Sequence, residues 1–322
     1  MFYSSFIVGF EELVKRIIES KYIDVSITQV LNGAIISRTY TSANIVDIPF
    51  LNNHFFVFKS SKASNINSFI ESLNDVNLKK CKNKRSFRVI ISDQNNLVSV
   101  DNKLLTKLEQ KISKETGNYV NRLKPDVEYW ILKRSEGIIL FMERISKHKS
   151  FDKQLNKGEL RDDLCYFLNY LSSPAEEDIF LDPFCGSGAI IKSRIRNDKF
   201  NMVFGVDIEQ SYIQELKGLY KKRNNIIFKS MDFFNNKFED DFIDKIVTDP
   251  PWGIYENIDN IQLFYQQAID EIYRIIKPKG VAVILTACKE EMESINTKLL
   301  LLEKYNILVS GKKASVYVYQ KN

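Results

Sequence analysis

The feature that most constrains the fold is a glycine-rich turn between a short apolar run and a helical pattern, in the sequence Phe180-Leu-Asp-Pro-Phe-Cys-Gly-Ser-Gly-Ala-Ile-Ile191. The apolar residues before the turn are typical of a parallel strand that is covered on both faces. Gly186 and Gly188 have no Cβ, so backbone N–H groups can approach a ligand closely beside the N-terminus of the following helix. A tight strand-to-helix connection without a ligand has the same sequence, so the motif alone leaves both interpretations open.

The next two stretches repeat this arrangement. Residues 201–207 form a second apolar run, and it ends in Asp207, about twenty residues after the glycines, where such folds hold a ribose through its hydroxyls. Residues 226–232 form a third, which brings Asp232 and Phe233 to a strand end where an adenine ring can be sandwiched. Each acid alone could be a helix N-cap, but acids ending successive strands at one sheet edge favour a nucleotide-like cofactor. The predicted cofactor-binding residues are Asp182, Phe184, Gly186, Gly188, Asp207, Ile208, Asp232, Phe233 and Asp249.

A fourth strand, predicted over residues 242–248, ends in Asp249-Pro250-Pro251-Trp252. Two consecutive prolines stiffen the turn and remove two backbone donors, which leaves carbonyls beside the Asp249 carboxylate as acceptors. Such a site fits a planar base with an exocyclic amine, because the amine can donate to Asp249 and to the Pro250 carbonyl while the ring stacks on Trp252. The alternative is an ordinary proline turn. The predicted catalytic residues are therefore Asp249, Pro250 and Trp252.

The order of these two motifs resembles a known family. Asp-Pro-Phe-Cys-Gly-Ser-Gly followed by Asp-Pro-Pro-Trp is similar to the class I S-adenosylmethionine-dependent amino methyltransferases, above all the THUMP-domain RNA guanine-N2 methyltransferases. The resemblance implies S-adenosyl-L-methionine as cofactor and a Rossmann-like sheet with a terminal antiparallel hairpin. The chain departs from the family pattern at Asp162, where proline is usual, and at Ala189, where threonine is common. Both departures affect the expected contacts to the methionine end of the cofactor.

The first half of the chain reads as a separate α+β region. A strand, a helix and a hairpin at Asn32-Gly33 give a β-α-β-β unit that resembles the ferredoxin-like start of THUMP methyltransferases. The segment Gly117 to Asp126 and the two strands after it resemble the second half of a THUMP domain. The predicted domains are a ferredoxin-like region 1–48, a THUMP-like RNA-binding domain 49–145, a linker 146–158 and a Rossmann-like methyltransferase domain 159–322.

Positive charge is concentrated in the second of these regions. Residues 81–150 carry 15 Lys or Arg and 8 Asp or Glu, a net charge of +7, whereas the whole chain has +5. A basic patch attracts phosphates without reading sequence, although a charge run can also be a solvated loop. The candidate RNA-binding residues are Lys84, Arg85, Arg88, Arg122 and Lys124.

Composition excludes several other classes. The four cysteines are widely separated and only His54 and His148 are histidines, so the spacing of a zinc site or a disulfide framework is missing, and we expect no metal. No run approaches the roughly twenty apolar residues that span a bilayer, and the first residues lack a signal-peptide pattern. We therefore expect a cytoplasmic protein without a membrane partner.

Together with these features, the family resemblance implies an enzyme that methylates the exocyclic N2 of a guanosine in RNA, first of all in tRNA, with tRNA or another structured RNA as partner. Three alternatives stay open: a ribosomal RNA guanine-N2 methyltransferase, a DNA adenine-N6 methyltransferase, and a non-catalytic RNA-binding assembly factor. The basic THUMP-like region argues against DNA, and the intact acids at four strand ends argue against a vestigial cofactor site.

Overall fold

The computed structural model describes residues 1–146, 159–253, 258–309 and 311–322. The chain divides into two compact units, one made of Met1–Phe6 and Glu11–Phe151 and the other of Ile7–Phe10 and Asp152–Asn322. The predicted linker 146–158 lies, apart from its first residue, outside the described residues. Within the described parts, no helix is both long and apolar enough to cross a membrane.

The first unit is built on one nine-stranded sheet in the order β2-β3-β1-β4-β9-β8-β5-β6, with β7 paired to β5. Strand β4 pairs with β1 on one side and with β9 on the other, so the sheet continues through the predicted boundary at residues 48 and 49. The strands are β1 Phe2–Ser5, β2 Ser26–Leu31, β3 Ala34–Arg38, β4 Asn52–Lys62, β5 Ser86–Asp93, β6 Asn96–Leu97, β7 Tyr119–Val120, β8 Val127–Lys133 and β9 Ile138–Arg144.

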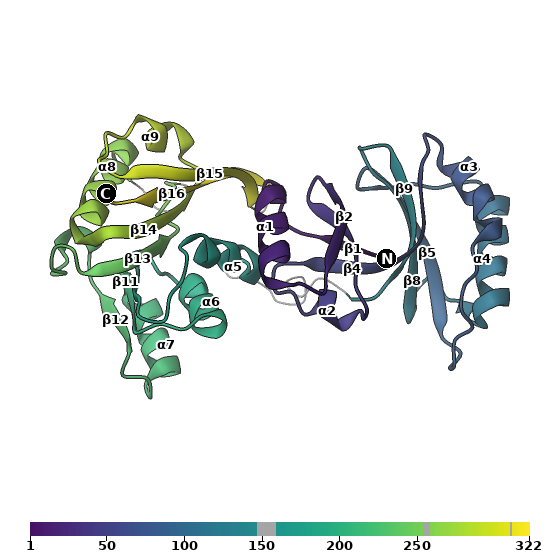
Figure 1. The fold of residues 1–322 in the computed structure, drawn as a ribbon, viewed down its shortest axis with the longest axis horizontal. Coiled ribbons are helices and arrows are strands. Elements are labelled where there is room, and N and C mark those ends of the chain that lie inside the picture. The colour runs from purple at the N-terminus through teal and green to yellow at the C-terminus, as the bar shows by residue number, and fades with distance from the viewer. Residues whose placement is uncertain (147–158, 254–257, 310) are drawn as a thin grey trace. The chain divides into compact units, whose positions relative to one another are not determined.

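Amphipathic helices cover this sheet. The helices are α1 Glu11–Lys21, α2 Ala43–Val46, α3 Ile66–Glu71, which continues as a 3-10 turn over Ser72–Asp75, and α4 Asn102–Thr116 (Figure 1). Helix α4 begins where the Asp101 side chain accepts hydrogen bonds from two backbone N–H groups, and it ends at Gly117, whose φ of 78° stops the helix. Helices α3 and α4 bury their apolar sides with Phe87 and Phe141 of the sheet.

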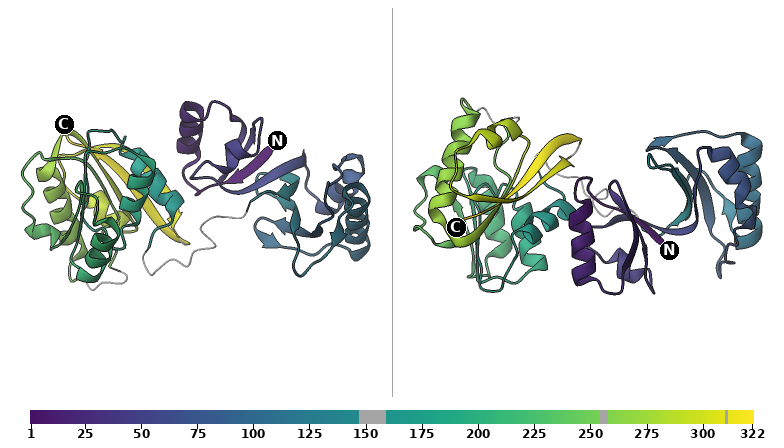
Figure 2. Two further views of the ribbon diagram at one scale, coloured as in Figure 1. Left: turned by 90° about the horizontal axis from the view of Figure 1, so that it is seen from below. Right: turned by 45° about the horizontal axis from the view of Figure 1, so that its top comes forward.

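The second unit contains a seven-stranded sheet in the order β12-β11-β10-β13-β14-β16-β15. The first five strands are parallel, and β16 runs antiparallel to both β14 and β15. Helices lie on both faces, α5 to α7 on one and α8 and α9 on the other (Figures 1 and 2). The predicted Rossmann-like sheet with a terminal hairpin is confirmed. The elements are α5 Asp162–Leu171, β10 Ile179–Asp182, α6 Ala189–Asn197, β11 Met202–Asp207, α7 Gln210–Tyr220, β12 Ile226–Ser230, β13 Ile243–Thr248, α8 Ile261–Ile275, β14 Ile276–Thr286, α9 Lys289–Ser294, β15 Leu300–Val309 and β16 Lys312–Gln320.

The sequence Lys277-Pro-Lys-Gly280 predicts a turn between α8 and the next strand, but β14 already begins at Ile276. Lys279 has a φ of 64°, and the pairing of β13 with β14 shifts register between Ile243 and Lys245. The backbone groups at this kink stay paired, because the N–H of Lys279 donates to the Lys321 carbonyl (2.8 Å) and the N–H of Lys321 to the Gly280 carbonyl (3.2 Å). The segment is therefore an irregular strand start rather than a free turn.

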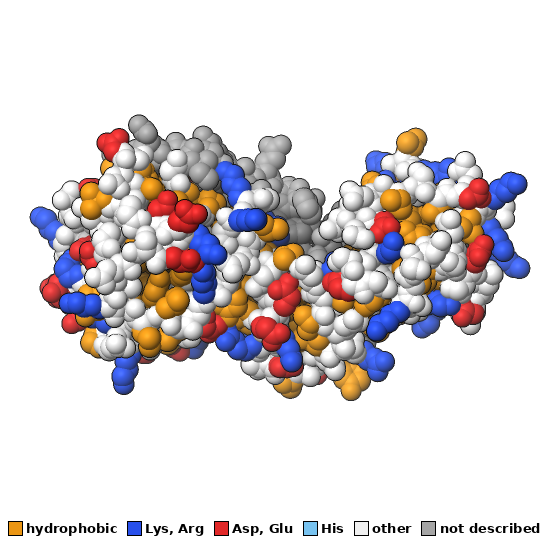
Figure 3. Space-filling model, turned by 90° about the horizontal axis from the view of Figure 1, so that it is seen from above, with side chains coloured by type: hydrophobic (Ala, Val, Ile, Leu, Met, Phe, Trp, Pro, Cys, Tyr) orange, Lys and Arg blue, Asp and Glu red, His pale blue; other side chains and the backbone are white. Residues whose placement is uncertain are grey.

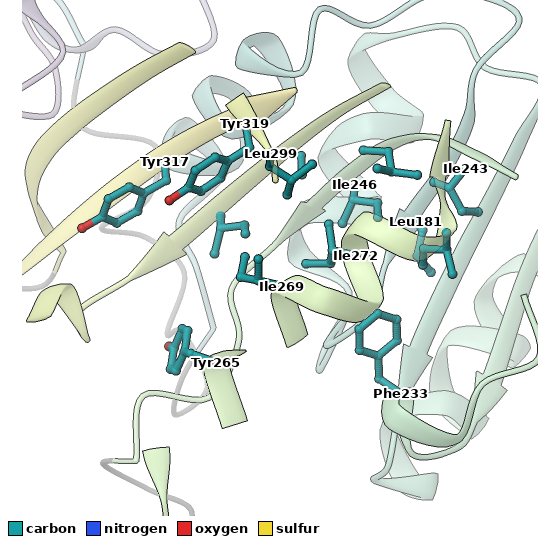
Figure 4. Packing of buried hydrophobic residues seen from close by; sticks show 14 of the residues in the cluster. Leu181, Phe233, Ile243, Ile246, Tyr265, Ile269, Ile272, Leu299, Tyr317 and Tyr319 are labelled. Atoms are coloured by element: carbon teal, nitrogen blue, oxygen red, sulfur yellow. The ribbon is translucent and has the colours of Figure 1, made fainter. Parts of the chain in front are cut away.

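Apolar packing between α8 and the sheet fixes the position of the parallel strands. Ile269 and Ile272 of α8 are buried with Ile246 of β13 and Leu181 of β10 in one cluster (Figure 4). This burial anchors the carboxyl ends of β10 and β13, where the predicted motifs begin.

Candidate active site

The glycine turn lies where the strand order reverses, because β10 has β11 on one side and β13 on the other. In open α/β sheets, ligands bind at such a switch point. Gly186 has a φ of 46° and Gly188, the N-cap of α6, a φ of 79°. A Cβ at Gly188 would lie 2.6 Å from Leu216, whereas a Cβ at Gly186 would meet no atom within 4 Å. A side chain at Gly188 would thus displace the side chain of Leu216, whereas the open side of Gly186 leaves room for a bound molecule.

Asp207, at the end of β11, holds this turn. Its Oδ2 accepts a hydrogen bond from the Gly186 N–H (2.7 Å), and its Oδ1 accepts one from the Glu209 N–H (2.9 Å). Each carboxylate oxygen keeps a second lone pair, which can accept from a ribose hydroxyl. The residue predicted to bind the ribose therefore also positions the turn, and this arrangement fits a nucleoside cofactor.

Asp182, which the sequence places among the cofactor-binding residues, is buried inside the protein. Its side chain is 1% exposed, and its Oδ1 accepts hydrogen bonds from the Thr248 hydroxyl (2.9 Å) and from the Phe184 N–H (3.3 Å). Burial raises the pKa of Asp182 to about 7, opposed by these hydrogen bonds and assisted by the charge of Asp207. Asp182 therefore supports the site from within the protein, linking β10 to the residue before Asp249.

At the third strand, where Asp232 and Phe233 are predicted to receive an adenine ring, the Phe233 ring is buried rather than open for stacking. Phe233 begins a 3-10 turn over Phe233–Asn235, and its ring is 2% exposed in the core (Figure 4). The centroids of the Phe233 and Phe184 rings are 5.4 Å apart. Asp232 caps this turn by accepting from the Phe234 N–H (3.0 Å). An exposed apolar side chain at this edge is Ile208, which is 76% exposed directly after β11.

The turn after β13 brings Asp249 and Trp252 together. The indole N–H of Trp252 donates to Oδ1 of Asp249 (2.8 Å), so the predicted aromatic wall is hydrogen-bonded to the predicted acceptor. Among the described residues, no hydrogen bond to the Pro250 carbonyl was found. Sequence reasoning predicted a stacking role for Trp252 but missed this contact, which depends on one side-chain conformation.

Two further residues contact the same turn, a third is hydrogen-bonded to one of them, and all three were missed from the sequence. The hydroxyl of Tyr265 on α8 donates to the Pro251 carbonyl (3.1 Å) and lies 2.6 Å from the hydroxyl of Thr286 on β14. The Cys288 thiol donates to the Trp252 carbonyl (3.4 Å). No local pattern marks these residues, because they are far from the turn in sequence.

The predicted RNA-binding arginines in the first unit are engaged in ion pairs. Arg88 and Arg144 both donate to Glu128, which is buried, and Arg122 donates to Glu109 (2.8 Å). Arg85 lies 3.6 Å from Glu143. On the face in Figure 3, Lys and Arg side chains are interspersed with Asp and Glu. The excess positive charge is thus carried mainly by exposed lysines: Lys82, Lys84, Lys103, Lys107, Lys114 and Lys124.

Comparison with known proteins agrees with this geometry. Residues 151–309 match the family of RMKL-like methyltransferase domains. A relative from Methanothermococcus thermolithotrophicus, named "Probable tRNA (guanine(10)-N2)-dimethyltransferase", is 29% identical over 164 residues, which cover 47% of this chain and 93% of that protein.

Two solved structures match the whole chain in fold. TrmN from Thermus thermophilus has a TM-score of 0.81 at 16% identity and covers 100% of this chain and 99% of its own. SMU.472 complexed with SAH, the demethylated form of S-adenosylmethionine, has a TM-score of 0.72 at 12% identity, with coverage of 100% and 98%. The second unit is therefore a Rossmann-like methyltransferase domain that uses S-adenosyl-L-methionine, and the chain is a methyltransferase.

Proposed function

We propose that the enzyme transfers a methyl group to the exocyclic N2 of a guanosine in RNA, with tRNA as the first substrate to test. The observation that carries the proposal is the Asp249 carboxylate, which directly follows β13, the strand that pairs with β10 and so precedes the same edge as the glycine turn. The relative's printed name supports a guanosine in tRNA as the target.

In the first unit we propose a ferredoxin-like region 1–48 and a THUMP-like domain 49–145 as the RNA-binding part.

The chemistry asks for placement rather than for a strong base. S-adenosylmethionine, when bound, supplies an electrophilic methyl group, and Asp207 with the Gly186–Gly188 turn are the residues proposed to hold it. An exocyclic amine conjugated with its ring is a poor nucleophile. Acceptors at Asp249 and at the Pro250 carbonyl would bind its N–H groups in a geometry that reduces the conjugation of the nitrogen lone pair with the ring. They would also orient this lone pair. The target base has to be unstacked to present this edge.

The contact between Trp252 and Asp249 adds one step to this scheme. The amine of the target base would replace the indole N–H on Oδ1 of Asp249, and the released indole would stack on the base. Asp249 would act as an acceptor in both states. We therefore propose that Asp249 orients the amine during methyl transfer, and that the methylated amine loses its extra proton to water after the transfer.

The test is single-turnover methylation of tRNA, with nucleoside mass analysis of the product. Asp249→Ala should abolish most of the turnover while leaving affinity for S-adenosylmethionine largely intact, because the lost contact matters chiefly in the transition state. Asp249→Asn, which keeps one carbonyl oxygen, should retain activity well above the alanine variant. Trp252→Phe tests the indole N–H separately, since it removes this donor to Asp249 but keeps a ring for stacking.

Three outcomes would contradict the proposal. Equal and complete loss in the Asn and Ala variants would make Asp249 a true proton acceptor. Full activity in both would place the acceptor site elsewhere. A product other than N2-methylguanosine, such as N6-methyladenosine, would refute the proposed substrate while keeping the methyltransferase assignment.

A further inference from the structure

We propose that Tyr265, Thr286 and Cys288 form a hydrogen-bond relay that positions the Asp249-Pro-Pro-Trp252 turn for methyl transfer. The three residues come from α8, from the end of β14 and from the residue before α9, whereas the turn follows β13. The inference rests on the proposed role of this turn in binding the acceptor amine. It assigns positioning residues outside the two motifs.

The direction of the relay follows from the donors and acceptors at its ends. The Cys288 N–H donates to the Thr286 hydroxyl (2.9 Å), and the Tyr265 hydroxyl donates to the Pro251 carbonyl (3.1 Å), which can only accept. Tyr265 has a single hydroxyl proton. The 2.6 Å contact between the two hydroxyls must therefore carry the Thr286 proton toward Tyr265. Only one arrangement of protons satisfies all three hydrogen bonds.

Burial makes this arrangement rigid. Tyr265 is 1% exposed and Thr286 is fully buried, so water does not compete for their hydroxyls. The Tyr265 ring projects from α8 into the same cluster as Ile269 (Figure 4). A buried polar group that loses its hydrogen-bond partner carries the full desolvation cost. Movement of any one of these residues is therefore disfavoured, because it would leave a neighbouring buried group without its partner.

The relay acts on the part of the turn that follows the proposed acceptors. Pro251 and Trp252 are consecutive, and their carbonyls are held by Tyr265 and by the Cys288 thiol (3.4 Å). On the other side, the Thr248 hydroxyl is hydrogen-bonded to Asp182. The Asp249 carboxylate and the Pro250 carbonyl lie between these two anchors, so their direction depends on both.

The first experiment uses the full chain with Trp130→Phe, which leaves Trp252 as its only tryptophan. Tyr265→Phe in this background should increase acrylamide quenching of Trp252 fluorescence, because the turn loses its anchor. The single-turnover rate constant should fall about ten- to a hundred-fold, as expected for a misplaced acceptor. Affinity for S-adenosylmethionine should change by less than about two-fold. Tyr273→Phe makes the same chemical change on the same helix, and neither readout should move.

A second pair of variants keeps the test decisive if Tyr265→Phe does not fold. Thr286→Val removes the hydroxyl at nearly constant volume and should reproduce the loss, whereas Thr286→Ser keeps the hydroxyl and should restore the rate. The double variant Tyr265→Phe/Thr286→Val should be no slower than the slower single variant, because the two residues act as one unit.

The outcomes separate this inference from the proposed function. Unchanged quenching in both Tyr265→Phe and Thr286→Val would refute the relay, and changed quenching with an unchanged rate would refute its effect on catalysis. The quenching measurement needs no RNA. If the wild type methylated a different acceptor, the proposed substrate would fail, and the rate comparison would be made with that acceptor.

Discussion

The buried carboxyl group of Asp182 predicts an unusual pH dependence of stability. Burial raises its pKa from the ordinary 3.8 to about 7 in the folded protein. Asp207 and the buried thiols of Cys185 and Cys165 interact with it electrostatically. Because the folded state binds this proton more strongly than the unfolded state, the free energy of unfolding should fall as pH rises from about 4 to about 7 and then level off.

Asp182→Asn isolates this effect. Asparagine is neutral at every pH and keeps an Oδ1 that can accept from Thr248 and from the Phe184 N–H. A rise in pKa from 3.8 to about 7, at about 1.36 kcal/mol per pH unit, gives an upper limit of about 4 kcal/mol. The variant should therefore be more stable than the wild type at pH 8, by up to this amount, and the difference should nearly disappear at pH 4.

The assay is urea unfolding from pH 4 to 8, followed by Trp252 fluorescence in the Trp130→Phe background, so that the signal reports the second unit. Asp259→Asn is the matched control, because it neutralises an exposed aspartate of the same unit. Its stability difference from the wild type should not change across this range. A difference for Asp182→Asn that is constant with pH, or a variant less stable than the wild type at pH 8, would refute the reasoning.

Three further predictions concern the cofactor site, the glycine turn and the basic residues of the first unit. Asp207→Ala should weaken binding of S-adenosylmethionine by about 1.5 to 3 kcal/mol per charged hydrogen bond lost, and calorimetry showing unchanged affinity would remove Asp207 from the cofactor site. Gly188→Ala should destabilise the second unit more than Gly311→Ala does in urea unfolding, because both have positive φ but only Gly188 would clash with Leu216. A plot of log affinity for tRNA against log salt has a negative slope. Lys84→Ala and Lys124→Ala should each reduce the magnitude of this slope by about 0.9 if each lysine contacts one phosphate. Arg88→Ala should change this slope less, because Arg88 is paired with Glu128, and equal slopes for all three variants would contradict that distinction.

The sequence was sufficient to predict the elements whose patterns are local. Strand β13 was expected over 242–248 and observed over Ile243–Thr248, and the helical pattern after the glycine turn was observed as α6, Ala189–Asn197. Apolar runs and helical periods determine such elements because burial on one or both faces is their main source of stability. The two-residue strands β6 and β7 were missed, since their pairing with β5 is a tertiary contact without a sequence pattern.

The arginines show a second limit of sequence reasoning. Arg88, Arg122 and the acids that pair with them are separated by 13 to 40 residues, so their pairing cannot be read from neighbouring letters. Counting charges correctly placed the positive excess in residues 81–150, but a count does not distinguish a paired arginine from an unpaired lysine. The fold decides this distinction by bringing β8 beside β5 and the loop after β7 beside α4.

Trp252 illustrates how a motif can be predicted from sequence while one of its contacts is missed. Its hydrogen bond to Asp249 leaves the carboxylate partnered before the target base arrives. Under the proposed function, a base that enters with an amine exchanges one donor for another, so Asp249 is not left without a partner. A base without an amine at this position would have to displace the indole and would leave Asp249 without a replacement hydrogen bond. A hydrogen bond to a charged group contributes about 1.5 to 3 kcal/mol, so this difference alone would favour an amine-bearing base roughly ten- to a hundred-fold. Selection of the substrate would then depend on the hydrogen bond between Trp252 and Asp249 before the base enters, as well as on the contacts made after it has entered.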